Sequence, residues 1–305
     1  MALQKEIWLG TIVENLFPDN SFASKSVDDS GFVDNKKVHI PNAGKPSAVK
    51  TNRDKFPATV ETRTDNDLEY EMDELTTDPI RIPNKESVEL SYAKRSSVVY
   101  NDREELRKNA AINILRRWAK TVPAASRVMT SGLAEVSHLT GTTGKRLAVV
   151  KADINKLMNL FNSHDIPQDG RYLLLDATMY GQLFSSLTEA EGNAFLACAD
   201  ASKGILGNYA GFNIMMRSTV LPLKADFSIN AGEAAATDIA AGFAWQESCV
   251  SRAIGDTKMF GKEDDPTYYG DIYSFLVRCG GSARRYDNKG IALLCQTTAV
   301  QEPTE

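Results

Sequence analysis

The stretch "FNSHDIPQDGRYLLLDATMYGQLFSS", residues 161–186, decides how the second half of the chain is interpreted. It gathers side chains that commonly take part in acid–base chemistry: His164, Asp165, Asp169, Arg171 and Asp176. In a catalytic interpretation, His164 would be a general base oriented by Asp165, and Arg171 would hold an anion. That interpretation lacks a nucleophile, because no serine or cysteine stands in a recognisable strained turn nearby.

A structural interpretation accounts for the same stretch without chemistry. The apolar spacing that precedes it predicts a helix ending near Asn162, and Pro167 and Gly170 in "DIPQDG" are typical of a turn. "RYLLLD" then reads as a short apolar strand, and Asp176 is a suitable N-cap for a following helix. We therefore predict a helix, a turn, a strand and a second helix, and we expect no catalytic residue here.

Composition excludes several classes of protein. The chain has 305 residues, of which 42% are hydrophobic and 25% are charged, as in ordinary soluble globular proteins. Its net charge of -5 gives no overall basic surface for nucleic acid. No apolar run reaches the roughly 18 residues of a membrane span. The four cysteines are far apart and include no CxxC motif, so we expect reduced and mostly buried thiols.

Three further motifs are weaker than they first look. "GTTGKR" (141–146) resembles a phosphate-binding loop, but Leu139 and Arg146 stand where that motif requires glycine and a hydroxyl residue. The three histidines are isolated, which disfavours a transition-metal site. "GKEDDPTYYGD" (261–271) lacks the alternating ligands of a calcium loop. We therefore expect no enzyme, no cofactor and no metal site.

The chain divides into segments of different character. In order these are a polar arm, a charged ribbon of extended strands, a lone helix, a compact α/β or α+β region and closing strands: residues 1–50, 51–98, 99–122, 123–270 and 271–305. Strands are predicted from alternation around 59–64 and 88–92, in a ribbon too polar to bury either face. The closing segment is predicted to form two strands joined by a turn containing Gly, Asp and Asn.

The lone helix is the clearest single element. Asn101 is a suitable N-cap with Glu104 in the capping-box position, and Pro123 ends the pattern. An apolar stripe runs along this otherwise charged helix, at Leu106, Ala110, Ile114 and Trp118. The helix is basic and could be taken for a nucleic-acid reader, but apart from Trp118 it lacks interleaved aromatic residues. A solvated or partner-facing helix is the favoured interpretation.

The order of these parts, and not any single residue, resembles the tailed-phage major capsid protein of the Hong Kong 97 type. In that family the parts are the N-arm, the extended loop, the spine helix, the A-domain and the P-domain. Three local patterns are similar to the family's: "IPQDGRYLLLDATMYGQLF" (166–184), "GILGNYAGFNIMMRSTVLP" (204–222) and "YSFLVRCGGSARRYDNKGIALL" (273–294). The resemblance covers nearly the whole chain. It implies an α+β capsid fold with residues 123–270 mainly in the A-domain.

The resemblance also implies a function and partners. Copies would assemble as pentamers and hexamers into an icosahedral shell around double-stranded DNA, located in the virion capsid, with a scaffolding protein and a portal as further partners and no membrane. Some relatives carry a helical scaffolding region ahead of the arm; here none is recognised, which leaves a separate scaffold or a cleaved precursor open. In this family the extended loop lies over a neighbouring subunit.

That loop suggests a hypothesis for the uneven charge. The ribbon is acidic and the helix is basic, so we expect contacts between subunits through two sets of side chains. The acidic set is Glu69, Glu71, Asp73 and Glu74, and the basic set is Arg103, Arg107, Arg116 and Arg117. Exposed ion pairs of this kind are each worth under about 1 kcal/mol, so they would set register more than stability.

Two other functions remain open at this point. An encapsulin-type nanocompartment shell would have the same fold. A folded N-terminal helix for cargo docking would favour that function, but residues 18–50 look extended. A soluble enzyme would use Asp165 or Asp176. Electron microscopy of the purified chain separates these, since shells or rings support either shell protein and a monomer with turnover supports the enzyme.

Overall fold

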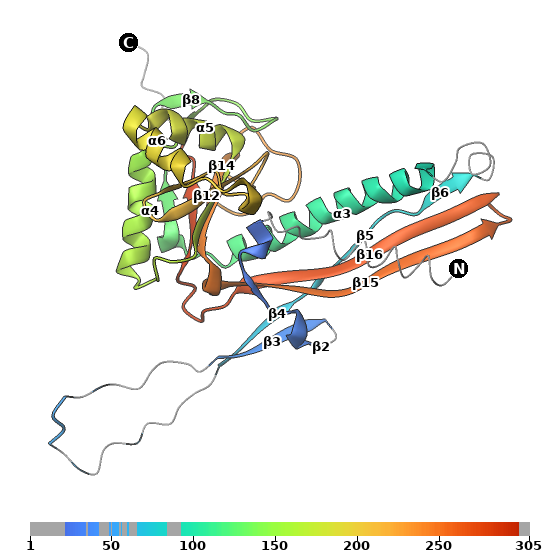
Figure 1. Ribbon diagram of the computed structural model, residues 1–305, viewed down its shortest axis with the longest axis horizontal. Helices are drawn as coiled ribbons and strands as arrows, with labels where there is room; N and C mark the ends of the chain where they lie inside the picture. The colour runs from blue at the N-terminus through green and yellow to red at the C-terminus, as the bar shows by residue number, and fades with distance from the viewer. Residues whose placement is uncertain are drawn as a thin grey trace.

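The computed structural model describes residues 22–34, 36–42, 49, 51–54, 56, 60, 66–83 and 93–298. Figure 1 shows a compact region at one end, from which a long helix and a long strand hairpin project together, while a narrow ribbon leaves in another direction. The fold is α+β, as predicted. No helix among these residues has both the length and the apolar character needed to cross a membrane.

A seven-stranded sheet forms the centre of the compact region among the described residues. Its order is β11 (Gly207–Tyr209), β12 (Phe212–Arg217), β10 (Arg171–Asp176), β14 (Ile239–Gln246), β17 (Ile291–Cys295) and β7 (Arg127–Met129), with β13 (Leu221–Leu223) beside β14. All of β10, β14 and β17 is buried, which explains their unbroken apolar runs.

Helices and a second core cover the two faces of this sheet. Helices α4 (Lys151–Ser163), α5 (Ala177–Ser186) and α6 (Glu189–Ala197) contribute to one apolar core, which includes Leu157, Leu183 and Phe195. The other face packs against the long helix α3 (Ala93–Lys120) in a separate core. A small two-stranded sheet, β8 (Ala134–Val136) with β9 (Lys145–Leu147), lies beside α5 (Figure 1).

The opening stretch folds as its structural interpretation predicted. Helix α4 ends at Ser163, residues 164–170 turn the chain, and β10 begins at Arg171. Gly170 has φ +66° in that turn, a conformation that glycine adopts without strain. Asp176 then caps α5.

Helix α3 runs from Ala93 to Lys120, so it begins before the predicted start. Asn101 therefore lies inside the helix, and its assignment as the N-cap was wrong. No glycine or proline interrupts residues 93–100, so a local capping signal did not prevent the helix from extending. The predicted apolar stripe is confirmed, because Leu106, Ala110, Ile114 and Trp118 are all at most 3% exposed.

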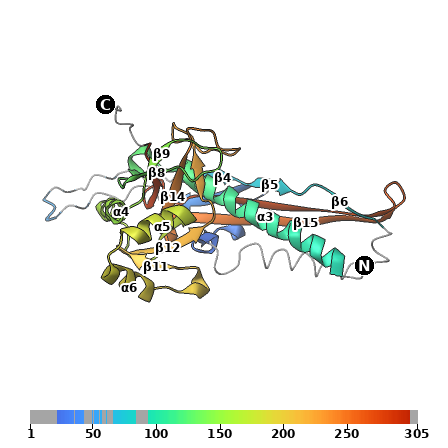
Figure 2. The same ribbon diagram turned by 90° about the horizontal axis from the view of Figure 1, so that it is seen from above.

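A second sheet extends alongside α3 (Figure 2). Strands β15 (Val250–Asp265) and β16 (Gly270–Ala283) form a long antiparallel hairpin, and β5 (Asp73–Thr76) and β6 (Ile80–Pro83) pair with β16. The short β1 (Val27–Asp28) pairs with β15. The predicted closing strands exist as β16 and β17 but do not pair with each other, because β17 belongs to the seven-stranded sheet. The hairpin partner β15 lies within the range predicted to be mainly A-domain.

The ribbon consists of β3 (Lys37–Asn42) paired with β4 (Asn66–Glu71), with β2 (Val33–Asp34) at its edge. Its strands β2 and β3 therefore lie in the range predicted as arm. Apart from Val60, the strands predicted at 59–64 and 88–92 fall outside the described residues. The expectation that the ribbon buries neither face was wrong at its base, where Val38, Tyr70 and Met72 pack with Ala253 of β15. Apolar residues at alternating positions are enough to bury one face there.

Five 3-10 turns complete the described elements: η1 (Phe22–Ser24), η2 (Ser30–Phe32), η3 (Ala124–Ser126), η4 (Ala201–Lys203) and η5 (Glu247–Cys249). The first of them places Phe22 against the core beneath α3.

Candidate functional site

Two polar residues of the opening stretch, Asp176 and Arg171, are buried and hold the fold. Asp176 is 3% exposed, and its carboxylate accepts a hydrogen bond from the backbone nitrogen of Met179 at 2.7 Å. Its second oxygen lies 2.8 Å from Nε2 of His138. Both oxygens of the carboxylate are therefore engaged. His164 follows the last turn of α4, where its backbone nitrogen closes that turn, and no catalytic pair with Asp165 is formed.

Arg171 is likewise structural. It is 1% exposed, and its guanidinium donates to the carbonyl oxygens of Pro167 at 2.8 Å and Ile166 at 2.5 Å. The same group lies over the ring of Phe161, 5.5 Å from the centroid. The arginine thus clamps the turn between α4 and β10, and its donors are not directed toward an anion.

The other candidate motifs lie at strand ends and the turns beside them. Arg146 of "GTTGKR" is buried, and Nη2 donates to the carbonyl oxygen of Asp238 at 3.0 Å. The motif at 261–271 forms the tip of the hairpin between β15 and β16, where Asp265 pairs with Lys262 at 2.8 Å. Among the described residues, no three His, Cys, Asp or Glu side chains are placed to hold a metal ion. All four cysteines are free, and three of them are buried, as predicted.

An aromatic cluster joins the projecting parts to the compact region. Trp118 of α3 stacks on Phe243 of β14 at a centroid distance of 6.0 Å, and Phe22 meets it edge-on at the same distance. The indole nitrogen of Trp118 donates to the carbonyl oxygen of Ser251 in β15 at 2.7 Å. Trp245 of β14 lies 5.9 Å from Trp118. The apolar stripe in the sequence predicts that Trp118 is buried, but no local pattern indicates which aromatic residues it contacts.

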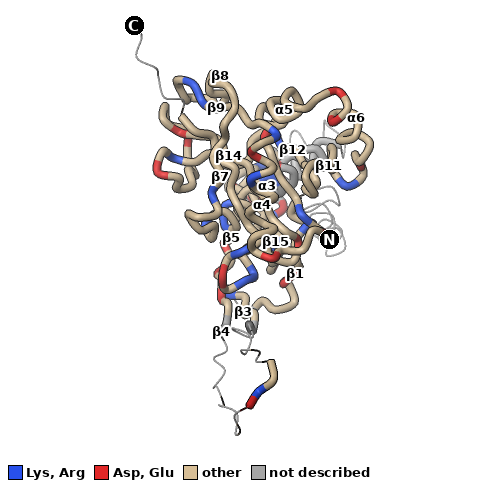
Figure 3. The backbone as a smooth tube through the Cα atoms, turned by 90° about the vertical axis from the view of Figure 1, so that its left-hand side faces the viewer, with Lys and Arg blue, Asp and Glu red and all other residues tan. Residues whose placement is uncertain are grey.

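The acidic residues of the ribbon find cations within their own chain. Glu69 of β4 lies 3.3 Å from Nζ of Lys37 and 3.2 Å from Nδ1 of His39, both on the paired strand β3. Glu74 of β5 lies 3.1 Å from Nε of Arg278 on β16. Figure 3 shows acidic and basic segments close together at the base of the ribbon. Two of the four predicted acids, Glu69 and Glu74, are therefore paired with cations on a neighbouring strand of the same chain.

Asp73 and Arg117, predicted as partners across subunits, form a two-pronged ion pair within one chain. Nε of Arg117 donates to Asp73 at 2.7 Å, and Nδ2 of Asn113 donates to the same carboxylate at 2.8 Å. The hydrogen bond from Arg117 is the main reason that the pKa of Asp73 lies below its usual value. This pair fixes β5 to the C-terminal part of α3.

For the remaining predicted residues, the described part of the chain contains no ion pair between the acidic and the basic set. Glu71 is exposed at the end of β4, and Nη2 of Arg116 lies 3.4 Å from the carbonyl oxygen of Ala231. Arg103 and Arg107 belong to α3, but their side chains lie outside the described residues. Contact of these residues with a neighbouring subunit stays a prediction.

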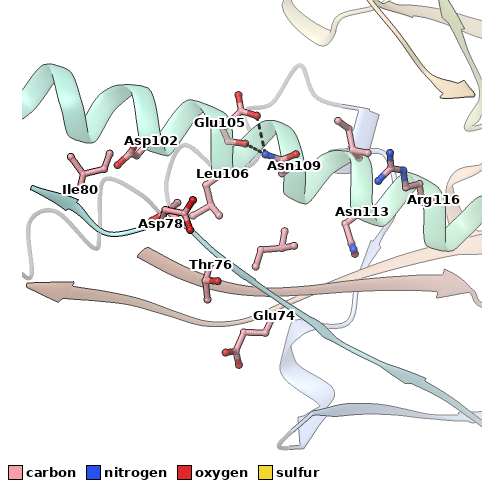
Figure 4. A pocket seen from close by; sticks show the side chains of 13 residues that line it. Glu74, Thr76, Asp78, Ile80, Asp102, Glu105, Leu106, Asn109, Asn113 and Arg116 are labelled. Atoms are coloured by element: carbon pink, nitrogen blue, oxygen red, sulfur yellow. Dashed lines mark hydrogen bonds between the residues drawn. The ribbon is translucent and has the colours of Figure 1, made fainter. Parts of the chain in front are cut away.

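A groove that sequence analysis missed lies between α3 and the strands β5 and β6. It has a volume of about 580 Å³ and is lined by both elements (Figure 4). Its charged side chains include Asp78, Asp102, Glu105 and Arg116, so acids outnumber bases, and Glu74 at its edge points away from the helix. Leu106 and Ile80 supply apolar surface. The acids of α3 and of the β5–β6 connection are distant in sequence, which is why no local pattern indicated the groove.

Solved structures of phage capsids have a similar fold. The capsid of the Cyanophage P-SCSP1u is similar with a TM-score of 0.63 and 16% identity, over 91% of this chain and 88% of that chain. The capsid of Ralstonia phage GP4 is similar with a TM-score of 0.62 and 12% identity, over 95% of this chain and 92% of that chain. The mature capsid of bacteriophage PhiM1 is similar with a TM-score of 0.60 and 13% identity, over 94% of this chain and 89% of that chain.

Sequence comparison alone finds no such relationship. No protein-family model matches the chain, and no curated protein matches it. The similarity in structure nevertheless spans nearly the full length of this chain and of the capsid chains, so it extends beyond the seven-stranded sheet to the projecting parts. The chain therefore has the major capsid protein fold of the Hong Kong 97 type that its sequence resembles.

Proposed function

We propose that this chain is the major capsid protein of a tailed phage, which assembles as pentamers and hexamers into the icosahedral shell of the virion and encloses double-stranded DNA. The observation that carries the proposal is the coverage of the structural similarity, 95% of this chain and 92% of the Ralstonia phage GP4 capsid chain. A shared central domain alone would leave the ribbon and the hairpin unmatched.

The shape of the chain supports the same function. The ribbon β3–β4, with only the two-residue β2 at its edge, projects well beyond the compact region (Figure 1), and narrow ribbons of this kind are marginal in water on their own. Such projections are expected to lie on other copies. Symmetric closed rings let one set of surfaces serve every subunit. A scaffolding protein, a portal and packaged DNA are the further partners that we propose, with no catalytic role for the chain.

The test is assembly of the purified chain. We expect negative-stain electron microscopy to reveal rings or shells after expression of the chain alone or with its scaffolding protein, and size-exclusion chromatography to place the chain far above its monomer mass of 33.5 kDa. Cryo-electron microscopy of the particles would then determine whether rings of five and six copies form. A protein that stays monomeric under both conditions would contradict the proposal.

A further inference from the structure

A basic patch lies where α3, β7 and the loop that follows β13 meet. It consists of Arg116 and Lys120 on α3, Arg127 at the start of β7, and Lys224 in the loop. Both lysines are exposed, and both arginines are partly buried. Figure 4 shows Arg116 at the opposite end of the drawn helix from Asp102, so the basic patch begins where the acidic groove ends.

Contacts through the loop hold these side chains in one region. Arg127 lies over the ring of Phe227, with its guanidinium carbon 5.5 Å from the ring centroid. The backbone nitrogen of Phe227 donates to the carbonyl oxygen of Lys224 at 2.8 Å. Further along the loop, the carbonyl oxygen of Ala231 accepts a hydrogen bond from Nη2 of Arg116 at 3.4 Å. The loop therefore contacts both β7 and α3.

The turn that carries Lys224 has a strained backbone. Phe227 has φ +63°, which is unusual for a bulky side chain. The carboxylate of Asp226 stabilises the turn, because it accepts hydrogen bonds from the backbone nitrogen of Ser228 at 2.9 Å and from its hydroxyl at 2.6 Å. Strain of this kind persists only where the surrounding structure holds it, and it gathers at binding sites.

The positive charge of the basic patch is not neutralised within the described part of the chain. None of its four cations has an ion-pair partner there, whereas Lys151, for example, pairs with Glu191 at 2.9 Å. Asp226 and Glu233 are acids of the same loop, and neither pairs with the patch among the described residues. Together with these two acids the patch has a net charge of +2.

The stability of the helix explains only part of this arrangement. Lys120 lies in the last turn of α3, where the helix dipole favours cations. Lys224 and Arg127 belong to other elements and gain nothing from that dipole.

The two arginines also have unused donors. Nε of Arg116 and Nε of Arg127 are buried and have no hydrogen-bond acceptor in the ranges that the structure describes. Both guanidinium groups are only partly buried, so a turn of the side chain presents these donors to solvent. Phosphate oxygens are strong acceptors for guanidinium groups. The basic patch therefore has both the charge and the donors that suit a polyanion.

We propose that the basic patch contacts the phosphate backbone of packaged double-stranded DNA without reading its base sequence. This inference rests on the proposed shell function, which supplies DNA as the enclosed polyanion. Duplex DNA carries one negative charge per about 1.7 Å of its axis, and Arg116 and Lys120 are about 6 Å apart along α3, so both reach phosphates of one duplex. The ring of Phe227 lies beneath Arg127 and does not stack on a base.

The salt dependence of DNA binding tests the proposal. Fluorescence anisotropy of a labelled 40-base-pair duplex of mixed sequence measures binding by the purified, unassembled chain. Four phosphate contacts predict that affinity falls about a hundredfold between 50 and 200 mM salt. In the chain with Lys120→Gln and Lys224→Gln, the fall should shrink to about tenfold, because two contacts are lost. A wild-type salt dependence in this variant would overturn the proposal.

A matched control has the same net charge as this variant. Arg81→Gln with Lys145→Gln removes two exposed cations that also lack an ion pair among the described residues, on β6 and β9. These strands lie away from the patch, so the control should keep the wild-type salt dependence. Lys120→Arg with Lys224→Arg keeps the charges and should bind like the wild type even if the glutamine variant folds poorly. Loss of binding in both the control and the arginine variant would overturn the proposal.

A competitor distinguishes DNA from an acidic protein. Unlabelled duplex should displace the labelled duplex at about a tenth of the charge concentration that polyglutamate needs, because its charges are more closely spaced. If the two polymers compete equally at equal charge, the patch binds acidic polymers in general, and its assignment to DNA is overturned.

Chemical labelling tests the contact in assembled particles. Acetylation with a small reagent, followed by mass spectrometry, should modify Lys120 and Lys224 several-fold less in DNA-filled particles than in empty ones. Lys145 should be modified equally in both. Equal labelling of all three lysines in the two kinds of particle would contradict the proposal.

Assembly of the same variants separates this inference from the function on which it rests. The glutamine variant and its control should both form rings or shells like the wild type, because the patch is proposed to contact DNA and not another copy. If the wild type forms neither, the proposed function fails. If all three assemble and bind DNA alike, only the inference fails. If the glutamine variant alone loses assembly, the patch is a contact between copies, and its assignment to DNA is overturned.

Discussion

The seven-stranded sheet and the parts that project from it differ in where their polar groups find partners. In the compact region, Asp176 and Arg171 are buried and fully paired by neighbours in the same chain. In the projecting parts, Asp78 and Asp102 line an open groove without described partners. The first region is held by contacts within one chain, whereas the second leaves acidic side chains without a described partner. We therefore expect assembly to depend more on the projecting parts than on the compact region.

The boundary between the two regions is the aromatic cluster around Trp118. Because this side chain is fully buried and touches α3, β14, β15 and η1, we expect the largest loss of stability from Trp118→Ala, about 3–5 kcal/mol in the free energy of unfolding. Urea denaturation of the unassembled chain measures this loss. Phe260→Ala, at a half-exposed position on the projecting hairpin, should cost about 0.5 kcal/mol or less. Equal losses for the two variants would show that the cluster does not join the regions.

Removal of the helix cap at Asp176, in the compact region, should lower the free energy of unfolding by a smaller amount. Asp176→Ala removes the acceptor for the backbone nitrogen of Met179 and leaves His138 without its partner, so we expect a loss of about 1–2 kcal/mol in the free energy of unfolding. Thermal unfolding followed by circular dichroism measures it. Thr188→Ala, which removes a cap on the exposed helix α6, should cost less. An Asp176→Ala chain with unchanged thermal stability would show that the capping assignment is wrong.

The sequence predicts the compact region well because its signals are local. A turn, an apolar strand and a cap within residues 161–186 each depend on neighbours a few positions away, and all are confirmed. The start of α3 was predicted too late, since a good N-cap at Asn101 does not stop a helix whose preceding residues also favour it. The positions at which a helix or strand begins and ends depend on tertiary packing, which the local sequence does not reveal.

The projecting parts were predicted less well because their pairings are long-range. Strand β3 pairs with β4 across more than twenty residues, β5 pairs with β16 at positions such as Thr76 and Leu276, and the groove joins residues near 78 to residues near 102. The charge hypothesis placed acids of the ribbon against arginines of the helix in a neighbouring copy, and Asp73 and Arg117 form an ion pair within one chain. Opposite charges in a sequence do not indicate whether their partners lie in the same copy.

The smallest expected effect concerns this internal pair, and it depends on pH. The pKa of Asp73 is lowered below 3.8 by Arg117, so the pair stabilises the folded chain fully above that value, and its contribution is lost as the pH falls through the folded-state pKa. Because Asp73 is partly exposed, we expect Asp73→Asn to lower the free energy of unfolding by under about 1 kcal/mol at pH 6 and by still less at pH 3. Urea denaturation at both pH values measures the difference, with Glu233→Gln as an exposed control. A deficit that stays constant between the two pH values would mean that the ionised carboxylate is not what fixes β5 to α3.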